Sequence, residues 1–130
     1  MAVHVPVSWG EVIDKITVLE IKSEKLRDAA KLANVRKELG LLVAIRDQEF
    51  PNHQDLAKLS AELKAINSAL WKIEDDIRDC ERDQDFGPKF IELARAVYVT
   101  NDERANVKRQ INDLLGSDLV EEKSYAPYKP

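Results

Sequence analysis

Apolar residues recur every three or four positions along most of this chain, which is the spacing of one face of an α-helix. The longest such run continues for about seven turns at 3.6 residues per turn. It consists of Leu56, Leu59, Leu63, Ile66, Leu70, Ile73, Ile77 and Cys80. Lys, Glu, Asp and Arg fill most of the positions between them. We therefore expect a long helix whose apolar seam packs against other helices at a shallow angle.

Capping signals predict a helix at about 9–27. Ser8 and Glu11 form a Ser-x-x-Glu capping box, in which the serine hydroxyl accepts from the Glu11 amide and the glutamate reaches back. Asp28 is suited to cap a second helix. The apolar stripe of that second helix is Leu32, Val35, Leu39 and Leu42. The pattern allows either a hairpin of two helices or one long bent helix, and Gly40 weakens the second by roughly 1 kcal/mol relative to alanine.

Two further breaks divide the rest of the chain. Phe50-Pro51-Asn52 predicts a stop followed by a new cap at Asn52. Pro88 suits a first helical turn and Gly116 a left-handed C-terminal cap, so we expect a last helix at about 88–115. Its stripe reads Phe90, Leu93, Val97, Thr100, Arg104, Val107, Ile111 and Leu114. The apolar phase continues past Thr100 and favours one helix, although Thr100–Glu103 is also a capping box that would divide it.

These elements predict an all-α fold, a single helical domain over residues 1–130. We expect an extended arm at 1–7, a helical body at 8–117 and a tail at 118–130. The body is a bundle of three to five long antiparallel helices. The 56–80 seam would be about 40 Å long, more than a domain with a radius of gyration near 14 Å covers easily. We therefore expect self-association, most simply as a dimer, to complete the bundle.

Composition narrows the class of protein. A chain of 130 residues with 44% hydrophobic and 34% charged residues is typical of amphipathic helices. The net charge of −4 gives no general attraction to nucleic acid or to anionic lipid. The start of the chain lacks the pattern of a signal peptide, and no stretch approaches the roughly 18 apolar residues that span a bilayer. With Cys80 as the only cysteine, we expect a cytoplasmic protein with no nucleic-acid or membrane partner.

Polar residues interrupt the apolar stripe of the 88–115 helix near its middle. A helix face that displays Arg, Lys, Asn and Tyr together can bind a carboxylate or a phosphate. The candidate ligand-binding residues are Tyr98, Thr100, Asn101, Arg104, Lys108 and Asn112. The structural alternative is an ion pair from Arg104 to a neighbouring helix, with Lys108 reaching water. The acidic partners available for that pair are Glu11, Asp14 and Glu20.

The string Asp75-Asp76-Ile77-Arg78-Asp79 is the weak metal candidate. Carboxylates four residues apart share a helix face and can hold Mg²⁺ through water or phosphate. Enzymes with such strings need a second carboxylate set facing the first, and none matches here, so we expect Asp75, Asp76 and Asp79 to form a solvated face. His4 and His53 have no cysteine beside them for zinc. Without a phosphate loop or a nucleophile elbow we expect no cofactor, and the pattern leans against an enzyme.

Several strings resemble an uncharacterised family of small bacterial all-helical proteins. They are SWGEVIDKITVLEIK at 8–22, KLANVRKEL at 31–39, FIELAR at 90–95, TNDERA at 100–105, INDLLGS at 111–117 and EEKSY at 121–125. The likeness covers nearly the whole chain and implies a bacterial helical protein, with no residue roles. A weaker likeness, at 13–16 and at Asp102-x-Arg104, is to helical chorismate mutases, which build helical dimers and bind a dicarboxylate with Arg and Lys.

The sequence thus favours a non-enzymatic helical interaction or assembly protein that pairs with a second copy of itself, and a further protein partner is compatible with it. The alternative is a binder or enzyme for a small anionic ligand, for example one similar to chorismate mutase. The two differ in whether Arg104 lies beside an open cavity or inside a sealed network of ion pairs.

Overall fold

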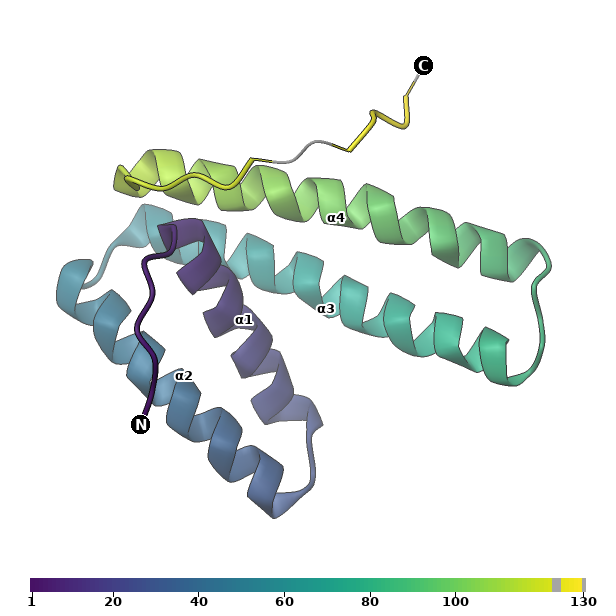
Figure 1. Ribbon diagram of the computed structural model, residues 1–130, viewed down its shortest axis with the longest axis horizontal. Coiled ribbons are helices and arrows are strands. Elements are labelled where there is room, and N and C mark those ends of the chain that lie inside the picture. Colours follow the sequence, from purple (N-terminus) through teal and green to yellow (C-terminus); the bar gives the residue numbers. More distant parts are fainter. Residues whose placement is uncertain (123–124, 130) are drawn as a thin grey trace.

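The computed structural model describes residues 1–122 and 125–129, and these form four helices and no strand (Figure 1). The helices are α1 (Trp9–Lys25), α2 (Ala29–Glu49), α3 (Gln54–Arg82) and α4 (Pro88–Leu115). The prediction of an all-α bundle is confirmed. Lys123 and Ser124 of the EEKSY string lie outside the described residues, as does the last residue of the predicted tail.

Local capping chemistry sets the first three of these boundaries. The Ser8 hydroxyl accepts from the Glu11 amide at 3.2 Å, although the Glu11 carboxylate bonds elsewhere and does not complete the box. Asp28 accepts from the Lys31 amide at 2.9 Å, so α1 and α2 are two helices joined by a short turn. Because Leu26 is extended, the chain reverses there and forms a hairpin.

The start of α3 corrects one prediction. We expected Asn52 to cap this helix, but His53 does so, with Nδ1 accepting from the Leu56 amide at 3.1 Å. Asn52 instead has a φ of 53° and supplies the left-handed residue of the connection. Histidine is not among the usual capping residues, so little in the sequence indicated this cap. The last helix agrees with its prediction: α4 is one continuous helix, and it ends at Gly116, which has a left-handed φ of 62°.

The four helices are arranged as two hairpins that cross (Figure 1). α1 packs against each of the other three helices, and α3 packs against α4. With 17 residues against 29, α1 is about 26 Å long and α3 about 44 Å. The α3–α4 hairpin therefore continues well past α1. We call this part, residues 71–82 of α3 and 88–100 of α4, the overhang.

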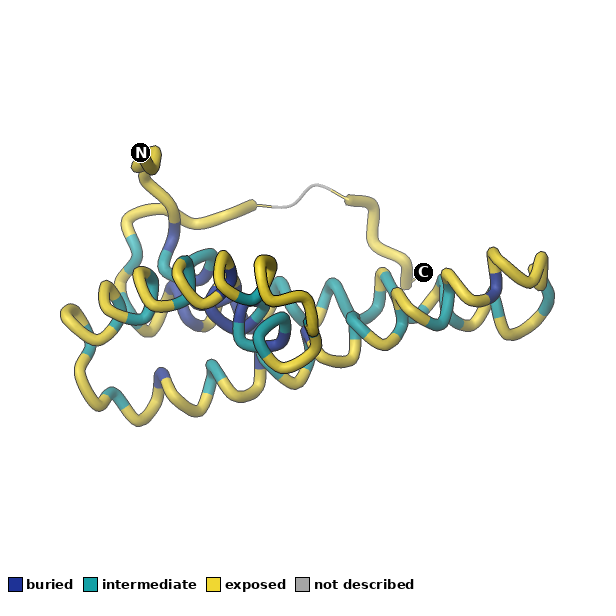
Figure 2. The backbone as a smooth tube through the Cα atoms, turned by 90° about the horizontal axis from the view of Figure 1, so that it is seen from below, coloured by how far each residue is buried: buried dark blue, intermediate teal, exposed yellow. Residues whose placement is uncertain are grey.

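The hydrophobic core lies at one end of the α3–α4 hairpin. Its buried members come from α1, α3 and α4, and each is at most 3% exposed: Ile13, Ile16, Leu56, Leu63, Val107 and Ile111. Figure 2 shows the buried residues gathered where α1 crosses the hairpin, while the overhang is mostly half-buried or exposed. Among the residues of the overhang only Cys80 is buried. The apolar seam of α3 that the sequence shows thus continues beyond the packed core.

A glycine allows α1 to lie directly against α4. A Cβ at Gly10 would stand 2.5 Å from the Lys108 carbonyl oxygen and 3.0 Å from Asn112 Oδ1. The Gly10 amide donates to that same Oδ1 at 2.6 Å. Gly40, in contrast, has no atom within 4 Å of where its Cβ would be. The two helical glycines therefore differ in what a methyl group would meet.

Gly10→Ala and Gly40→Ala should change stability in opposite directions. We expect Gly10→Ala to lower the free energy of unfolding by about 1–3 kcal/mol, because the helices must separate to admit the methyl group. Gly40→Ala should raise it by about 0.5–1 kcal/mol, because alanine costs less backbone entropy in an open helical position. Urea denaturation followed by circular dichroism measures both. A Gly10→Ala protein as stable as the wild type would contradict the close contact.

Candidate functional site

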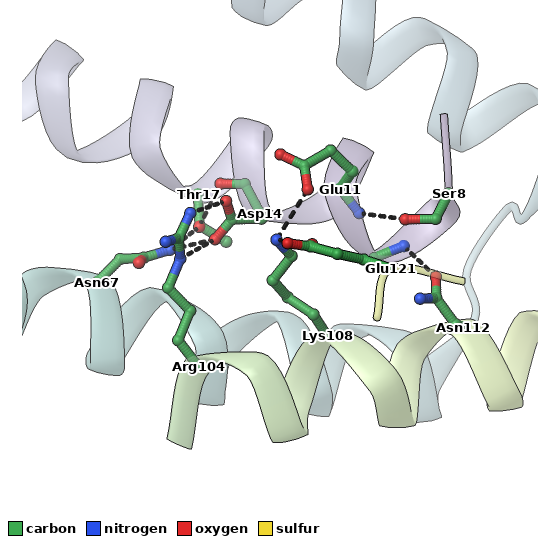
Figure 3. Close-up of polar contacts among 10 residues, drawn as sticks. Ser8, Glu11, Asp14, Thr17, Asn67, Arg104, Lys108, Asn112 and Glu121 are labelled. Atoms are coloured by element: carbon green, nitrogen blue, oxygen red, sulfur yellow. Dashed lines mark hydrogen bonds and ion pairs between the residues drawn. The ribbon is translucent and has the colours of Figure 1, made fainter. Parts of the chain in front are cut away.

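A buried carboxylate on α1, Asp14, is the centre of a polar network between three helices (Figure 3). The residue is 3% exposed. Arg104 of α4 donates to it with two nitrogens, Nε to Oδ1 at 2.9 Å and Nη2 to Oδ2 at 2.5 Å. Two parallel charge-assisted bonds of this kind fix the orientation of both side chains. Of the three acidic partners considered for Arg104, the structure thus selects Asp14.

The third helix joins the network through Asn67. Its amide nitrogen donates to Asp14 Oδ1 and to Thr17 Oγ1, each at 2.9 Å. Thr17 donates in turn to the Asp14 carbonyl at 2.7 Å. Among the described residues, no buried side-chain nitrogen or oxygen lacks a hydrogen-bond partner. Each fully buried polar atom at the centre of the fold therefore has a hydrogen-bond partner.

This environment keeps Asp14 ionised. Burial by itself raises the pKa of the Asp14 carboxyl, but the hydrogen bonds from Arg104 and Asn67 and the positive charges of Arg104 and Lys108 outweigh it. The pKa of Asp14 accordingly lies below its ordinary value of 3.8. On the other side of the pair, the hydrogen bond to Asp14 raises the pKa of the Arg104 guanidinium. The pair is a stable ion pair at neutral pH.

Lys108 forms a second contact between α4 and α1. Its ammonium lies 2.8 Å from a carboxylate oxygen of Glu11 and 2.8 Å from one of Glu121, in the segment after α4. Burial lowers the pKa of Lys108, yet these two hydrogen bonds outweigh it and the pKa is raised. The expectation that Lys108 reaches water is wrong, because this residue is only 8% exposed. Its charge is used to hold two acidic segments together.

The remaining candidate residues are divided between two places. Asn112 is 3% exposed and accepts from the Gly10 amide, so it lies with Arg104 and Lys108 on the side of α4 that faces α1. Tyr98 is 44% exposed, and its ring centroid lies 5.5 Å from that of Tyr128 in the tail. Thr100 and Asn101 are half-buried between these two groups along α4. The six candidates therefore share one helix without forming one cluster.

Sequence reasoning missed Asn67 and Thr17. A signal for Asn67 exists, because it is a polar residue beside Leu63, Ile66 and Leu70 in an otherwise apolar seam. Polar residues at such positions usually have a buried partner. Thr17 gives no comparable signal, since its hydroxyl mainly serves the backbone of its own helix.

The aspartates of the α3 string have separate surroundings. Asp76 pairs with Lys72 at 3.0 Å, and Asp79 pairs with Arg82. Asp75 has no ion pair within residues 1–122 and 125–129. In that same part of the chain, no group of three His, Cys, Asp or Glu side chains is arranged to hold a metal ion. No helix there combines the length and the apolar character needed to cross a membrane.

Breaking the central ion pair should cost much more than breaking a surface pair. We expect Arg104→Ala to lower the free energy of unfolding by about 3 kcal/mol, because it leaves the Asp14 carboxylate buried without its counter-ion. Asp14→Ala/Arg104→Ala should cost less than the sum of the two single changes. Arg109→Ala, which breaks the exposed pair with Glu122, is the control and should leave stability nearly unchanged. Additive costs in the double variant would show that the pair is not coupled.

The lowered pKa of Asp14 also predicts a dependence on acid. A carboxyl whose pKa is lower in the folded state contributes stability above its unfolded pKa, here 3.8, and loses it as the pH falls through the folded value. The difference in unfolding free energy between the wild type and Asp14→Asn should therefore be constant near neutral pH. It should narrow as the pH falls below about 4. Denaturation curves at a series of pH values measure it, and a difference that widens in acid would contradict the assignment.

Comparison with known proteins identifies the family but no activity. The model of DUF6165, a family of unknown function, matches residues 3–129. No curated protein and no solved structure matches the chain. The resemblance to an uncharacterised family is thereby confirmed, while a bacterial origin stays a prediction. This chain, over nearly its whole length, is a member of the DUF6165 family.

Proposed function

We propose that this protein is a non-enzymatic helical assembly protein that pairs with a second copy of itself through the overhang. The observation that carries the proposal is the extension of the α3–α4 hairpin past α1, which leaves the apolar seam of the hairpin half-buried. The resemblance to bacterial sequences and the single Cys80 support a bacterial, cytoplasmic setting.

Helical spacing shows which side of the overhang lacks a cover. Arg104 of α4 faces α1, and Val97, Ala94 and Phe90 precede it by seven, ten and fourteen residues, which keeps them on that side of the helix. All three are half-buried. On α3, Asn67 faces α1 and Trp71 follows it four residues later. Beyond Trp71 this face of the α3–α4 hairpin extends past the end of the hydrophobic core.

The charges of the overhang favour a second copy over a partner of one sign. The acidic residues of its two helices are Glu74, Asp75, Asp76, Asp79, Glu81 and Glu92, and the basic residues are Lys72, Arg78, Arg82, Lys89 and Arg95. In a two-fold interface each residue meets a different residue of the same patch, so interspersed charges can pair with one another. A strongly acidic or basic partner would meet like charges. Two hairpins joined in this way would form a four-helix, coiled-coil-like bundle.

Exposed apolar side chains at the far end of the hairpin support the same proposal. Phe86 is 47% exposed and Ile91 is 55% exposed. The Phe86 ring meets that of Phe90 edge to face, with centroids 5.3 Å apart. Apolar groups that gather on one protruding element are typical of association surfaces.

The ion pairs weigh against the alternative of an anion site on the α4 face. Arg104 is already neutralised by Asp14, and Lys108 by Glu11 and Glu121. A dicarboxylate of the kind that chorismate mutases bind needs both basic side chains, and at Lys108 it would have to displace the carboxylates of Glu11 and Glu121. The free energy gained from the new contacts would then be offset by the loss of the old ones.

Ala94→Arg should disrupt the pairing without unfolding the chain. Arginine is nearly as good a helix former as alanine. At position 94, however, it places a long charged side chain on the face of the overhang that α1 does not cover. We expect the wild type to sediment as a dimer at micromolar concentration and Ala94→Arg to weaken the dimer by about tenfold or more. Ala65→Arg makes the same change at an exposed position of α3 and should leave the dimer intact.

Two outcomes of sedimentation velocity would contradict the proposal. One is a wild-type protein that is strictly monomeric at these concentrations. The other is an Ala94→Arg protein that dimerises as well as Ala65→Arg, because the overhang would then not be the interface.

A further inference from the structure

A cavity of about 370 Å³ lies between the second half of α1 and the start of the overhang. Val18 of α1 and Leu70 and Trp71 of α3 give it an apolar lining. Arg104 of α4 and Asn67 of α3, both members of the central network, also line it. Its volume is near the lower end of the range for small-molecule sites, so it suits a small ligand.

Two polar groups of this lining have hydrogen-bonding capacity left over. Arg104 uses Nε and Nη2 on Asp14, and its Nη1 makes no hydrogen bond within the described part of the chain. Asn67 is 6% exposed and donates both amide hydrogens, but its Oδ1 accepts no bond from the described residues. That oxygen is therefore accessible from outside the fold, because every fully buried side-chain nitrogen or oxygen of the described residues has a hydrogen-bond partner. The lining thus offers one donor edge and one acceptor.

The third polar group of the lining is the carboxylate of Asp75. Asp75 lines the cavity and has no ion pair within the described residues, whereas its neighbour Asp76 is bound to Lys72. The two other charged lining residues, Glu74 and Arg78, neutralise each other in an ion pair at 2.5 Å. Asp75 therefore remains as an unpaired charge, and the Nη1 edge of Arg104 remains as a hydrogen-bond donor whose charge is shared with Asp14.

We infer that this cavity binds a small zwitterion with a compact apolar body, that is, a free α-amino acid or a molecule with the same groups. The carboxylate of the ligand would bind the free edge of Arg104, and its ammonium group would bind Asp75. The apolar body would lie against Val18, Leu70 and Trp71. A simple anion would be repelled by Asp75 and Asp14, and a simple cation would leave the Nη1 donor of Arg104 without an acceptor.

Three probes with one apolar body separate these charge requirements. L-leucine carries both charges, 4-methylpentanoate carries only the carboxylate, and 3-methylbutylamine carries only the ammonium group. In isothermal titration calorimetry on the full chain we expect L-leucine to bind, and each single-charge analogue to bind at least about tenfold more weakly. L-phenylalanine is a second zwitterion with a larger body. The inference is overturned if neither amino acid binds, or if an analogue binds as well as L-leucine.

Adjacent aspartates provide a matched pair of variants. Asp75→Asn should weaken the binding of L-leucine by about tenfold or more, because it removes a charge-assisted bond to the ammonium group. Asp76→Asn, on the next residue and outside the cavity, should leave it unchanged. Circular dichroism melting shows whether both variants are folded; Asp75 is exposed and Asp76 is half-buried. Equal affinities in the two variants would overturn the inference.

Four residues of the cavity lining, Trp71, Glu74, Asp75 and Arg78, belong to the overhang, so the ligand site and the proposed interface need separate tests. Ala94→Arg, which should disrupt the dimer, should keep the affinity for L-leucine. If this variant becomes monomeric and also loses L-leucine binding, the ligand site belongs to the interface and the inference for a single chain fails. If it stays dimeric but the wild type still binds L-leucine, only the proposed interface fails.

Discussion

The buried Asp14 carboxylate constrains this structure more than any other single group. An ionised side chain in the interior is costly unless a counter-ion and hydrogen bonds replace the water that it loses. Here the counter-ion comes from α4 as Arg104 and a further hydrogen bond from α3 as Asn67. Three helices must therefore meet at one point with correct orientations. The apolar residues Ile13 and Ile16, beside Asp14 in sequence, are then placed in the core.

The position of α1 at this crossing decides which part of the long hairpin is covered. α1 can approach α4 closely only because Gly10 has no side chain, and Lys108 then reaches Glu11 across the contact. The core ends where α1 diverges from α3. Since α3 and α4 continue well beyond that point, the remaining seam is left half-buried. The crossing therefore limits the extent of the core, while the lengths of α3 and α4 are set by their own ends.

Local elements of this fold could be predicted from the sequence because their causes are local. The Ser8 and Asp28 caps, Pro88 and Gly116 act within a few residues, and four of the helix limits follow from them. The cap at His53 was missed since it depends on the ring orientation of an unusual capping residue. For Arg104, three acidic residues of α1 were candidate partners, and the sequence could not distinguish among them. That choice depends on the angle at which α1 crosses α4, which is a property of the tertiary packing.

The contrast between local and tertiary causes also explains why the residue types on the α4 face did not show whether they bind an internal or an external group. Arg, Lys and Asn on one helix face are equally suited to an external anion and to an internal carboxylate, because both present the same oxygen atoms. What distinguishes the two is how many donors the fold itself consumes. Asp14 takes two nitrogens of Arg104 and leaves the third, while Asn67 gives both its hydrogens and keeps its oxygen. A network that fixes a helix crossing can thus also provide the polar edge of a neighbouring cavity, and a structural role for Arg104 does not argue against a second one.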